Sequence, residues 1–253
     1  MNKYESLKEK LAAHKPVTMG NCMVLSSPFM LDAFNEMDSV LLDKEHGIYG
    51  SEELIPLTMR CRQLGLPSIV RVEESSYHLV AKAIDLGADG IMLPRAETVE
   101  QVKTVVDAMH FAPIGRTGIG GWGILRDGET IPEFQKGRFF FPQIESPKGL
   151  AAMPEMIEKY GEYIDGFIIG PNDYSIMMGV PREVDHPVML EEIRKVFEVC
   201  RSYGISYGCF AADAAHANLY AEMGANIFWI GDDKSCLTLG IRTLMNGVDV
   251  LRK

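Results

Sequence analysis

Polar residues that could carry chemistry stand at the ends of several apolar runs in this 253-residue sequence. One run closes on Gln143 and Glu145, and another is followed by Asp173. If these runs are neighbouring strands of a parallel sheet, both carboxylates reach one edge and can hold a hard divalent cation, with positions left for water and a chelating substrate. Spacing alone leaves a second interpretation open, because such carboxylates can also cap the following turns and pair with Arg or Lys.

A histidine and an arginine have similar positions. His46, in the string Asp43-Lys44-Glu45-His46-Gly47, could act as a base if a carboxylate orients it, although a histidine beside acidic residues is more often a surface residue. Arg71 ends an otherwise apolar run, where its guanidinium must find an anion. That anion could be a neighbouring glutamate or the carboxylate of a substrate, so a structural and a catalytic role both remain open.

The elements that would position these residues follow one repeated pattern: a helix-like stretch, a glycine and a short apolar run. A glycine readily adopts the left-handed backbone conformation that often follows the end of a helix. An uninterrupted apolar run is typical of a strand buried on both faces. Helices are predicted at residues 52–64, 76–86, 98–109 and 188–202, the third with a capping box from Thr98 and Gln101. Eight strands are predicted, at residues 17–25, 39–43, 68–71, 90–95, 138–145, 166–173, 206–210 and 226–233.

Strands that alternate with helices indicate a parallel sheet, and eight such units close most naturally into a (β/α)8 TIM barrel. A doubly wound open sheet is the alternative. No Pro/Ser/Gly-rich tract, charge block or low-complexity run interrupts the pattern, so residues 1–253 are predicted to form a single domain.

Residues 110–137 break the pattern with many turn residues, and we expect them to form a long loop over the carboxyl ends of the strands. Residues 118–123 fit the pattern GxGxxG. A dinucleotide site needs this pattern between a strand and a helix, whereas Arg126-Asp127-Gly128 and Pro132 follow it here. The glycines are better explained by a close approach of the loop to a ligand or a neighbouring subunit.

The formal net charge of −10 disfavours binding to nucleic acid or to an anionic membrane. The sequence shows no signal peptide and no apolar segment of membrane-spanning length. Five cysteines form no CxxC pair, which favours reduced thiols and a cytoplasmic protein. Lysines are scarce in the predicted strands, which argues against a Schiff-base mechanism.

Several strings resemble one known family when their order and spacing are taken together. They are Leu42-Asp43-Lys44-Glu45-His46, Val70-Arg71, Leu93-Pro94, Gln143-Ile144-Glu145 and Gly170-Pro171-Asn172-Asp173-Tyr174-Ser175. Over nearly the whole chain they are similar to the HpcH/HpaI aldolase family, the class II pyruvate-dependent aldolases related to the citrate lyase β-subunit. The resemblance implies a TIM barrel of the pyruvate-binding type. It also implies a lyase that cleaves or forms 4-hydroxy-2-oxo acids through a pyruvate enolate.

The resemblance also implies roles for individual residues. Arg71 would stabilise the enolate, and His46, oriented by Asp85, would move protons through a metal-bound water. Without the resemblance, Asp85 would be taken for a surface residue at a helix end. The metal, Mg²⁺, Mn²⁺ or Co²⁺, would be held by Glu145 and Asp173, and pyruvate would lie against Gln143, Pro171 and Asn172.

One string departs from the family pattern. The family loop carries Arg-Gly-x-Gly, whereas here Thr117 stands at the expected arginine and Arg116 lies one position earlier. Because this loop helps to form the aldehyde side of the site and contacts between subunits, we expect Arg95 and Trp122 to supply other contacts there. The second substrate, an aldehyde in the first hypothesis, is therefore open.

Two other functions remain as alternatives. One is a citrate-synthase-like or citryl-lyase-like reaction with oxaloacetate or an acyl-CoA, and the other is a catalytically silent binding barrel. The resemblance further implies a homo-oligomer, often a hexamer. The apolar stretch at residues 236–251 could pack on a neighbour or on its own barrel.

Overall fold

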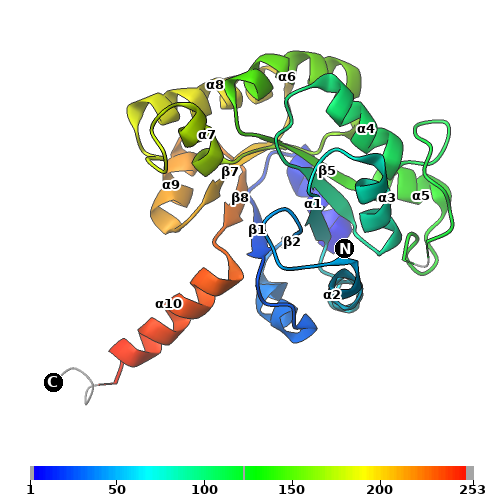
Figure 1. Ribbon diagram of the computed structural model, residues 1–253, viewed down its shortest axis with the longest axis horizontal. Coiled ribbons are helices and arrows are strands. Elements are labelled where there is room, and N and C mark those ends of the chain that lie inside the picture. Colours follow the sequence, from blue (N-terminus) through cyan, green and yellow to red (C-terminus); the bar gives the residue numbers. More distant parts are fainter. Residues whose placement is uncertain (1–2, 122, 249–253) are drawn as a thin grey trace.

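Eight parallel strands close into a barrel in the computed structural model, which describes residues 3–121 and 123–248 (Figure 1). The predicted TIM barrel is confirmed, and the doubly wound open sheet is excluded because β8 pairs with β1. The strands follow one another around the barrel in chain order: β1 (Val17–Cys22), β2 (Ser39–Asp43), β3 (Ser68–Arg71), β4 (Gly90–Leu93), β5 (Phe139–Ile144), β6 (Phe167–Ile169), β7 (Tyr207–Ala211) and β8 (Ile227–Ile230).

Helices surround the barrel and connect its strands (Figure 1). The capping box predicted for Thr98 is present, since its side chain accepts from the Gln101 amide and the Gln101 side chain accepts from the Thr98 amide. The helices are α1 (Lys3–Ala12), η1 (Pro28–Glu36), α2 (Ser51–Leu64), α3 (Tyr77–Asp85), α4 (Val99–Met109), α5 (Ile131–Gly137), α6 (Pro147–Tyr160), η2 (Gly161–Tyr163), α7 (Pro171–Met177), α8 (Pro187–Tyr203), α9 (Ala214–Glu222) and α10 (Asp233–Asn246). None of them, within the described residues, has the length and apolar character needed to cross a membrane.

The lumen of the barrel is apolar along most of its length and polar at the carboxyl ends of the strands. Successive residues of a strand point to opposite faces, so every second residue enters the lumen. A polar layer continues the same alternation at the carboxyl ends, through Asn21, Asp43, Arg71, Gln143 and Glu145. The apolar part is one buried cluster with Val17, Met19, Leu41, Ile69, Met92, Phe139, Phe141, Ile168, Ile227 and Trp229 among its members.

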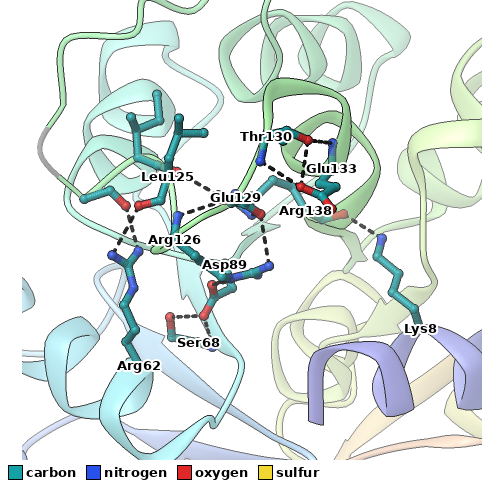
Figure 2. Close-up of polar contacts among 12 residues, drawn as sticks. Lys8, Arg62, Ser68, Asp89, Leu125, Arg126, Glu129, Thr130, Glu133 and Arg138 are labelled. Carbon is teal, nitrogen blue, oxygen red and sulfur yellow. Dashed lines mark hydrogen bonds and ion pairs between the residues drawn. The ribbon is translucent and has the colours of Figure 1, made fainter. Parts of the chain in front are cut away.

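The long connection at residues 110–137 lies at the amino ends of the strands, so its predicted place over the carboxyl ends is wrong. It joins α4 to β5, and a helix-to-strand connection in a parallel barrel returns to the amino end. Arg126 in this connection donates to Asp89, which directly precedes β4. Asp89 in turn accepts from the amide of Ser68 at the start of β3 (Figure 2).

Buried ion pairs close this amino end of the barrel (Figure 2). Each carboxylate oxygen of Asp89 and of Glu129 accepts two hydrogen bonds. The donors to Glu129 come from Arg126 and from Arg138, the residue before β5. These ion pairs hold the 110–137 connection against the amino ends of β4 and β5.

The last helix, α10, projects away from the barrel (Figure 1). Its buried residue is Asp233 in the first turn. Apolar side chains along the rest of the helix are exposed: Leu237, Leu239, Ile241, Leu244 and Met245.

Candidate active site

A cavity of about 150 Å³ lies at the carboxyl ends of the strands. Catalytic sites of TIM barrels occur at this end, where strand ends and βα loops from different parts of the chain converge. The cavity brings together most of the predicted site residues, and its lining is Asn21, Met23, His46, Arg71, Gln143, Gly170, Pro171, Asn172, Asp173, Phe210 and Trp229.

Arg71 is held rigidly by a carboxylate of the adjacent strand. β2 and β3 place Asp43 beside Arg71, and the guanidinium donates through Nε to Oδ1 at 2.9 Å and through Nη2 to Oδ2 at 2.5 Å. Its third nitrogen, Nη1, lies 3.2 Å from Glu45 Oε2 and 3.4 Å from Gln143 Oε1. Burial alone would lower the pKa of Arg71, but Asp43 and Glu45 raise it, so the side chain stays charged.

Asp43 also shapes the loop that carries His46. Its Oδ1 accepts from the backbone amides of Glu45 at 3.0 Å and His46 at 3.2 Å. The sequence analysis assigned no role to Asp43, although its position at the end of a predicted strand was visible. His46 lines the cavity with its side chain half exposed, and its Nε2 lies 3.8 Å from Glu45 Oε2.

Asp85 does not lie beside His46 within the chain. It ends α3, just before β4, and its carbonyl accepts from the amide of Gly123 at the amino end of the barrel. His46 follows β2 at the carboxyl end, so the barrel separates the two side chains. The predicted dyad is therefore not formed in one copy of the chain, and Glu45 is the carboxylate nearest to His46.

Glu145 and Asp173, the predicted metal ligands, both lie beside the guanidinium of Arg95. Arg95 Nε is 4.0 Å from Glu145 Oε2, and Arg95 Nη2 is 3.6 Å from Asp173 Oδ1. Arg95 adopts a left-handed backbone conformation with φ of 47°, which non-glycine residues rarely adopt away from functional sites and turns. Two carboxylates, one directly after β5 and one in the first turn of α7, thus face the same small volume.

Glu145 has an environment that disfavours its own charge. Burial, followed by repulsion from Glu45 and Asp173, raises the pKa of Glu145 to about 8, even though Arg71 and Arg95 act in the opposite direction. Gln143 Nε2 donates to Glu145 Oε1, while the other oxygen, Oε2, is buried without a hydrogen-bond partner in the described part of the chain. A buried carboxylate oxygen without a donor is costly unless a cation binds it.

Gly170 provides the space that this arrangement needs. A Cβ at this position would lie 2.2 Å from Glu145 Oε1 and 2.5 Å from Gln143 Nε2, far inside van der Waals contact. Any side chain here would therefore displace the carboxylate. Among the described residues there is no group of three or more His, Cys, Asp or Glu arranged to hold a metal.

The opposite wall of the cavity was missed by sequence reasoning. It contains Asn21 of β1, Phe210 of β7 and Trp229 of β8. The guanidinium of Arg71 lies over the ring of Trp229, 5.0 Å from its centroid. Asp233 holds the adjoining loop, because its Oδ2 accepts from the amides of residues 23, 24 and 25. The alternation of each strand could have identified these inward positions.

Other predicted residues have different locations. Pro171 and Asn172 line the cavity from the first turn of α7. Thr117 is buried and Arg116 packs over the ring of Tyr77, both in the connection at the amino end, far from the cavity of the same chain. Trp122 lies outside the described residues.

Comparisons with known proteins identify related sequences and structures. The model of the HpcH/HpaI aldolase/citrate lyase family matches residues 23–238. A 2-keto-3-deoxy-L-rhamnonate aldolase from Salmonella gallinarum is 29% identical over 212 residues, which cover 79% of this chain and 76% of that protein. The crystal structure of an HpcH/HpaI aldolase from Desulfitobacterium hafniense superimposes with a TM-score of 0.85 at 27% identity, covering 94% of this chain and 96% of the other.

A citrate synthase structure also has this fold, with a TM-score of 0.82 at 21% identity and coverage of 95% of this chain and 96% of the other. At that identity the likeness concerns the fold alone. The family match and the relatives confirm the prediction of an aldolase-type carbon–carbon lyase. With most of its length matched by the family model, and its cavity at the catalytic end of the barrel, the chain belongs to the HpcH/HpaI aldolase/citrate lyase family.

Proposed function

We propose that the protein is a divalent-metal-dependent aldolase that cleaves or forms a 4-hydroxy-2-oxo acid through the enolate of pyruvate. One observation supports this most directly. Glu145 and Asp173 share a small volume at the edge of a cavity that also contains Arg71, and Glu145 Oε2 has no hydrogen-bond donor in the described residues. A hard cation would compensate these carboxylates, and a guanidinium in the same cavity suits an oxygen that becomes negative.

Glu145 and Asp173 would hold the cation, which is Mg²⁺, Mn²⁺ or Co²⁺ in this proposal. When bound, such an ion acts as a Lewis acid toward the keto group of a 2-oxo acid. Arg95 now lies between the two carboxylates, and its side chain is 65% exposed, so it can swing outward when a cation takes its place. From there Arg95 would contact the aldehyde side of the site.

Arg71 would donate hydrogen bonds to the enolate oxygen of pyruvate. Asp43 occupies two of its nitrogens and thereby fixes the direction of the third, Nη1, toward Gln143 and Glu45. A donor held in place before the reaction needs no reorganisation as charge develops, which is the source of its catalytic effect. Gln143, Pro171 and Asn172 would form the wall against which pyruvate lies.

His46 would exchange protons with the substrate at the open side of the cavity. Its ring is half exposed. The loop that carries it is held by Asp43, whose carboxylate accepts from the backbone amides of Glu45 and His46. Within one chain Glu45 is the carboxylate that can orient it. Asp85 would take part only if a second copy of the chain brought it to this end of the barrel.

The experiment is a metal-depletion and add-back assay of cleavage of 4-hydroxy-2-oxo acids. We expect chelator-treated protein to lose activity and to regain it with Mn²⁺ or Mg²⁺, whereas the Glu145→Ala variant stays inactive after metal is added. Activity that is indifferent to chelator would remove the metal from the proposal. Acetyl-CoA with oxaloacetate belongs in the same panel, because turnover of that pair would favour the citrate-forming alternative.

Binding measurements separate an enzyme from a silent barrel. We expect calorimetry to show that pyruvate or oxalate binds in the presence of Mn²⁺ and much more weakly without it. Absence of metal-dependent binding together with absence of turnover would support the silent barrel.

We further propose that the protein forms a homo-oligomer through α10, with the hexamer of the family resemblance as the specific expectation. The outward residues of β8, Phe228 and Ile230, are only half buried, while α10 projects away with its apolar side chains exposed (Figure 1). Packing of α10 on a second copy would cover such surfaces. Light scattering should give a multiple of the chain mass, reduced by Leu244→Asp but unchanged by Val188→Asp on α8.

The proposed location is a reducing compartment such as the cytoplasm. Cys22, Cys61, Cys200 and Cys209 are buried free thiols. Mass spectrometry of denatured protein alkylated without reductant should find them modified, and a disulfide among them would contradict the proposal.

A further inference from the structure

Two buried polar side chains, each with one atom that lacks a hydrogen-bond partner among the described residues, line the cavity on the wall opposite the two carboxylates. Asn21 is 2% exposed and Trp229 is 3% exposed, and both line the cavity. Asn21 Oδ1 and Trp229 Nε1 have no hydrogen-bond partner in the described part of the chain. One acceptor and one donor are thus left without a partner in the wall beside the place where a substrate would bind.

The register of the barrel makes these side chains neighbours. On the adjacent strand β1, the residue paired with Trp229 is Met19, and Asn21 follows two positions later on the same lumen face. Cross-strand neighbours at this diagonal offset are within reach of long or aromatic side chains. β1 and β8 lie across the closed barrel from β4 and β5, so this pair faces the side from which Glu145 projects.

The indole is held in one orientation by its surroundings. Phe210 packs edge-on against it with ring centroids 4.9 Å apart, and the guanidinium of Arg71 lies on it at 5.0 Å. The direction of the Nε1 hydrogen is thus set before a ligand arrives. Leaving a buried donor and a buried acceptor without partners is costly, and Phe and Leu would fill much of the same space without that cost.

A hydroxyl group complements this pair, because one hydroxyl can donate to Asn21 Oδ1 and accept from Trp229 Nε1. We infer that Asn21 and Trp229 are a specificity-determining pair that recognises a hydroxyl group on the aldehyde joined to the 2-oxo acid. The inference rests on the proposed function, in which Gln143, Glu145 and Asp173 take the 2-oxo acid on the other side of the cavity. A hydroxyaldehyde is then preferred over an alkyl aldehyde of the same length.

The test compares two aldehydes that differ by one hydroxyl, glycolaldehyde and acetaldehyde, in addition to pyruvate with Mn²⁺ present. The readout is the ratio of kcat/KM for glycolaldehyde to that for acetaldehyde within each protein, so a general loss of activity cancels. We expect the wild type to favour glycolaldehyde, and Asn21→Leu and Trp229→Phe each to lower the ratio about tenfold. Phe29→Leu, a change of the same size at an exposed residue that does not line the cavity, should keep the ratio within about twofold of wild type.

An NMR measurement with the wild-type protein separates the hydroxyl assignment from the proposed function. It monitors the exchange of the pyruvate methyl protons for deuterium in D₂O. Exchange with an unchanged aldehyde ratio in both variants would overturn the hydroxyl assignment and leave the pair as partners of an ordered water. Absence of metal-dependent exchange would overturn the proposed function and this inference with it.

Thermal unfolding of substrate-free protein provides a second readout. We expect Asn21→Leu to melt at or above the wild-type temperature, because the change removes an unpartnered buried oxygen. A lower melting temperature together with a wild-type aldehyde ratio would mean that Asn21 supports the fold and does not recognise substrate.

Discussion

The two ends of this barrel both bury charged side chains, but they treat carboxylates differently. At the amino end, each oxygen of Asp89 and Glu129 accepts two hydrogen bonds (Figure 2). At the carboxyl end, Glu145 Oε2 accepts none within the described residues, and the carboxylates of Glu45 and Asp173 raise the pKa of Glu145 further. Carboxylates whose oxygens all accept hydrogen bonds stabilise the fold. A buried carboxylate oxygen that accepts none indicates a site that a ligand completes.

The comparison predicts the largest effect on stability at the amino end. Asp89→Asn should lower the free energy of unfolding by about 3–5 kcal/mol, since it removes one partner of a buried ion pair and places an amide against the donors of Arg126 and Ser68. Denaturant titration measures the change, and Mn²⁺ binding to the folded variant should be retained. A loss of less than about 1 kcal/mol would contradict the structural role of this network.

Arg71→Met should produce the next largest effect, on catalysis. Loss of a preorganised donor to the enolate should lower kcat by about 10²–10³-fold, as is typical for removal of one such donor. The matched control is Arg126→Met. Like Arg71, Arg126 pairs with a buried aspartate, but it does so at the amino end of the barrel. That control should unfold more easily and yet keep kcat per folded molecule, and equal loss of kcat in both variants would erase the proposed distinction.

Glu145→Gln tests the carboxylate whose Oε2 accepts no hydrogen bond within the described residues. We expect the affinity for Mn²⁺, measured by calorimetry, to fall at least about 100-fold because a charged ligand is lost. In metal-free protein the melting temperature should rise by about 2–4 °C, the shift that about 1 kcal/mol produces in a domain of this size. Burial first, and repulsion from Glu45 and Asp173 second, raise the pKa of this carboxyl in the folded state, and an amide does not carry that cost. A lower melting temperature with metal binding intact would assign Glu145 to the fold.

The smallest effect concerns acid stability. Burial alone would raise the pKa of Glu129, but hydrogen bonds and charge from Arg138 and Arg126 bring it below its ordinary value of 4.5. A carboxyl with a lowered pKa in the folded state stabilises the protein above the unfolded pKa and loses that contribution as pH falls through the folded value. The difference in unfolding free energy between wild type and Glu129→Gln should therefore shrink below about pH 4.5. A constant difference would contradict it.

The amino acid sequence was sufficient to predict the closed barrel and the end of it where chemistry occurs. Apolar runs separated by helices and glycines determine the alternation of elements, and strand ends determine which polar residues meet. Glu145, Asp173, Arg71 and His46 were identified as candidates in this way, with structural roles left open until the family resemblance was considered, and the structure brings them to one cavity or its edge. The prediction that the 110–137 connection covers the carboxyl ends failed because turn content says nothing about which end a connection occupies, whereas its order between α4 and β5 does.

Only the tertiary structure decided which charges pair and which remain without partners. Asp43 binds Arg71 because β2 and β3 place them side by side, and Asp85 is separated from His46 by the length of the barrel. The unpartnered atoms of Asn21 and Trp229 depend likewise on register and closure. Such facts involve residues far apart in the chain, and the energy of a buried polar group depends on its actual neighbours rather than on its own type.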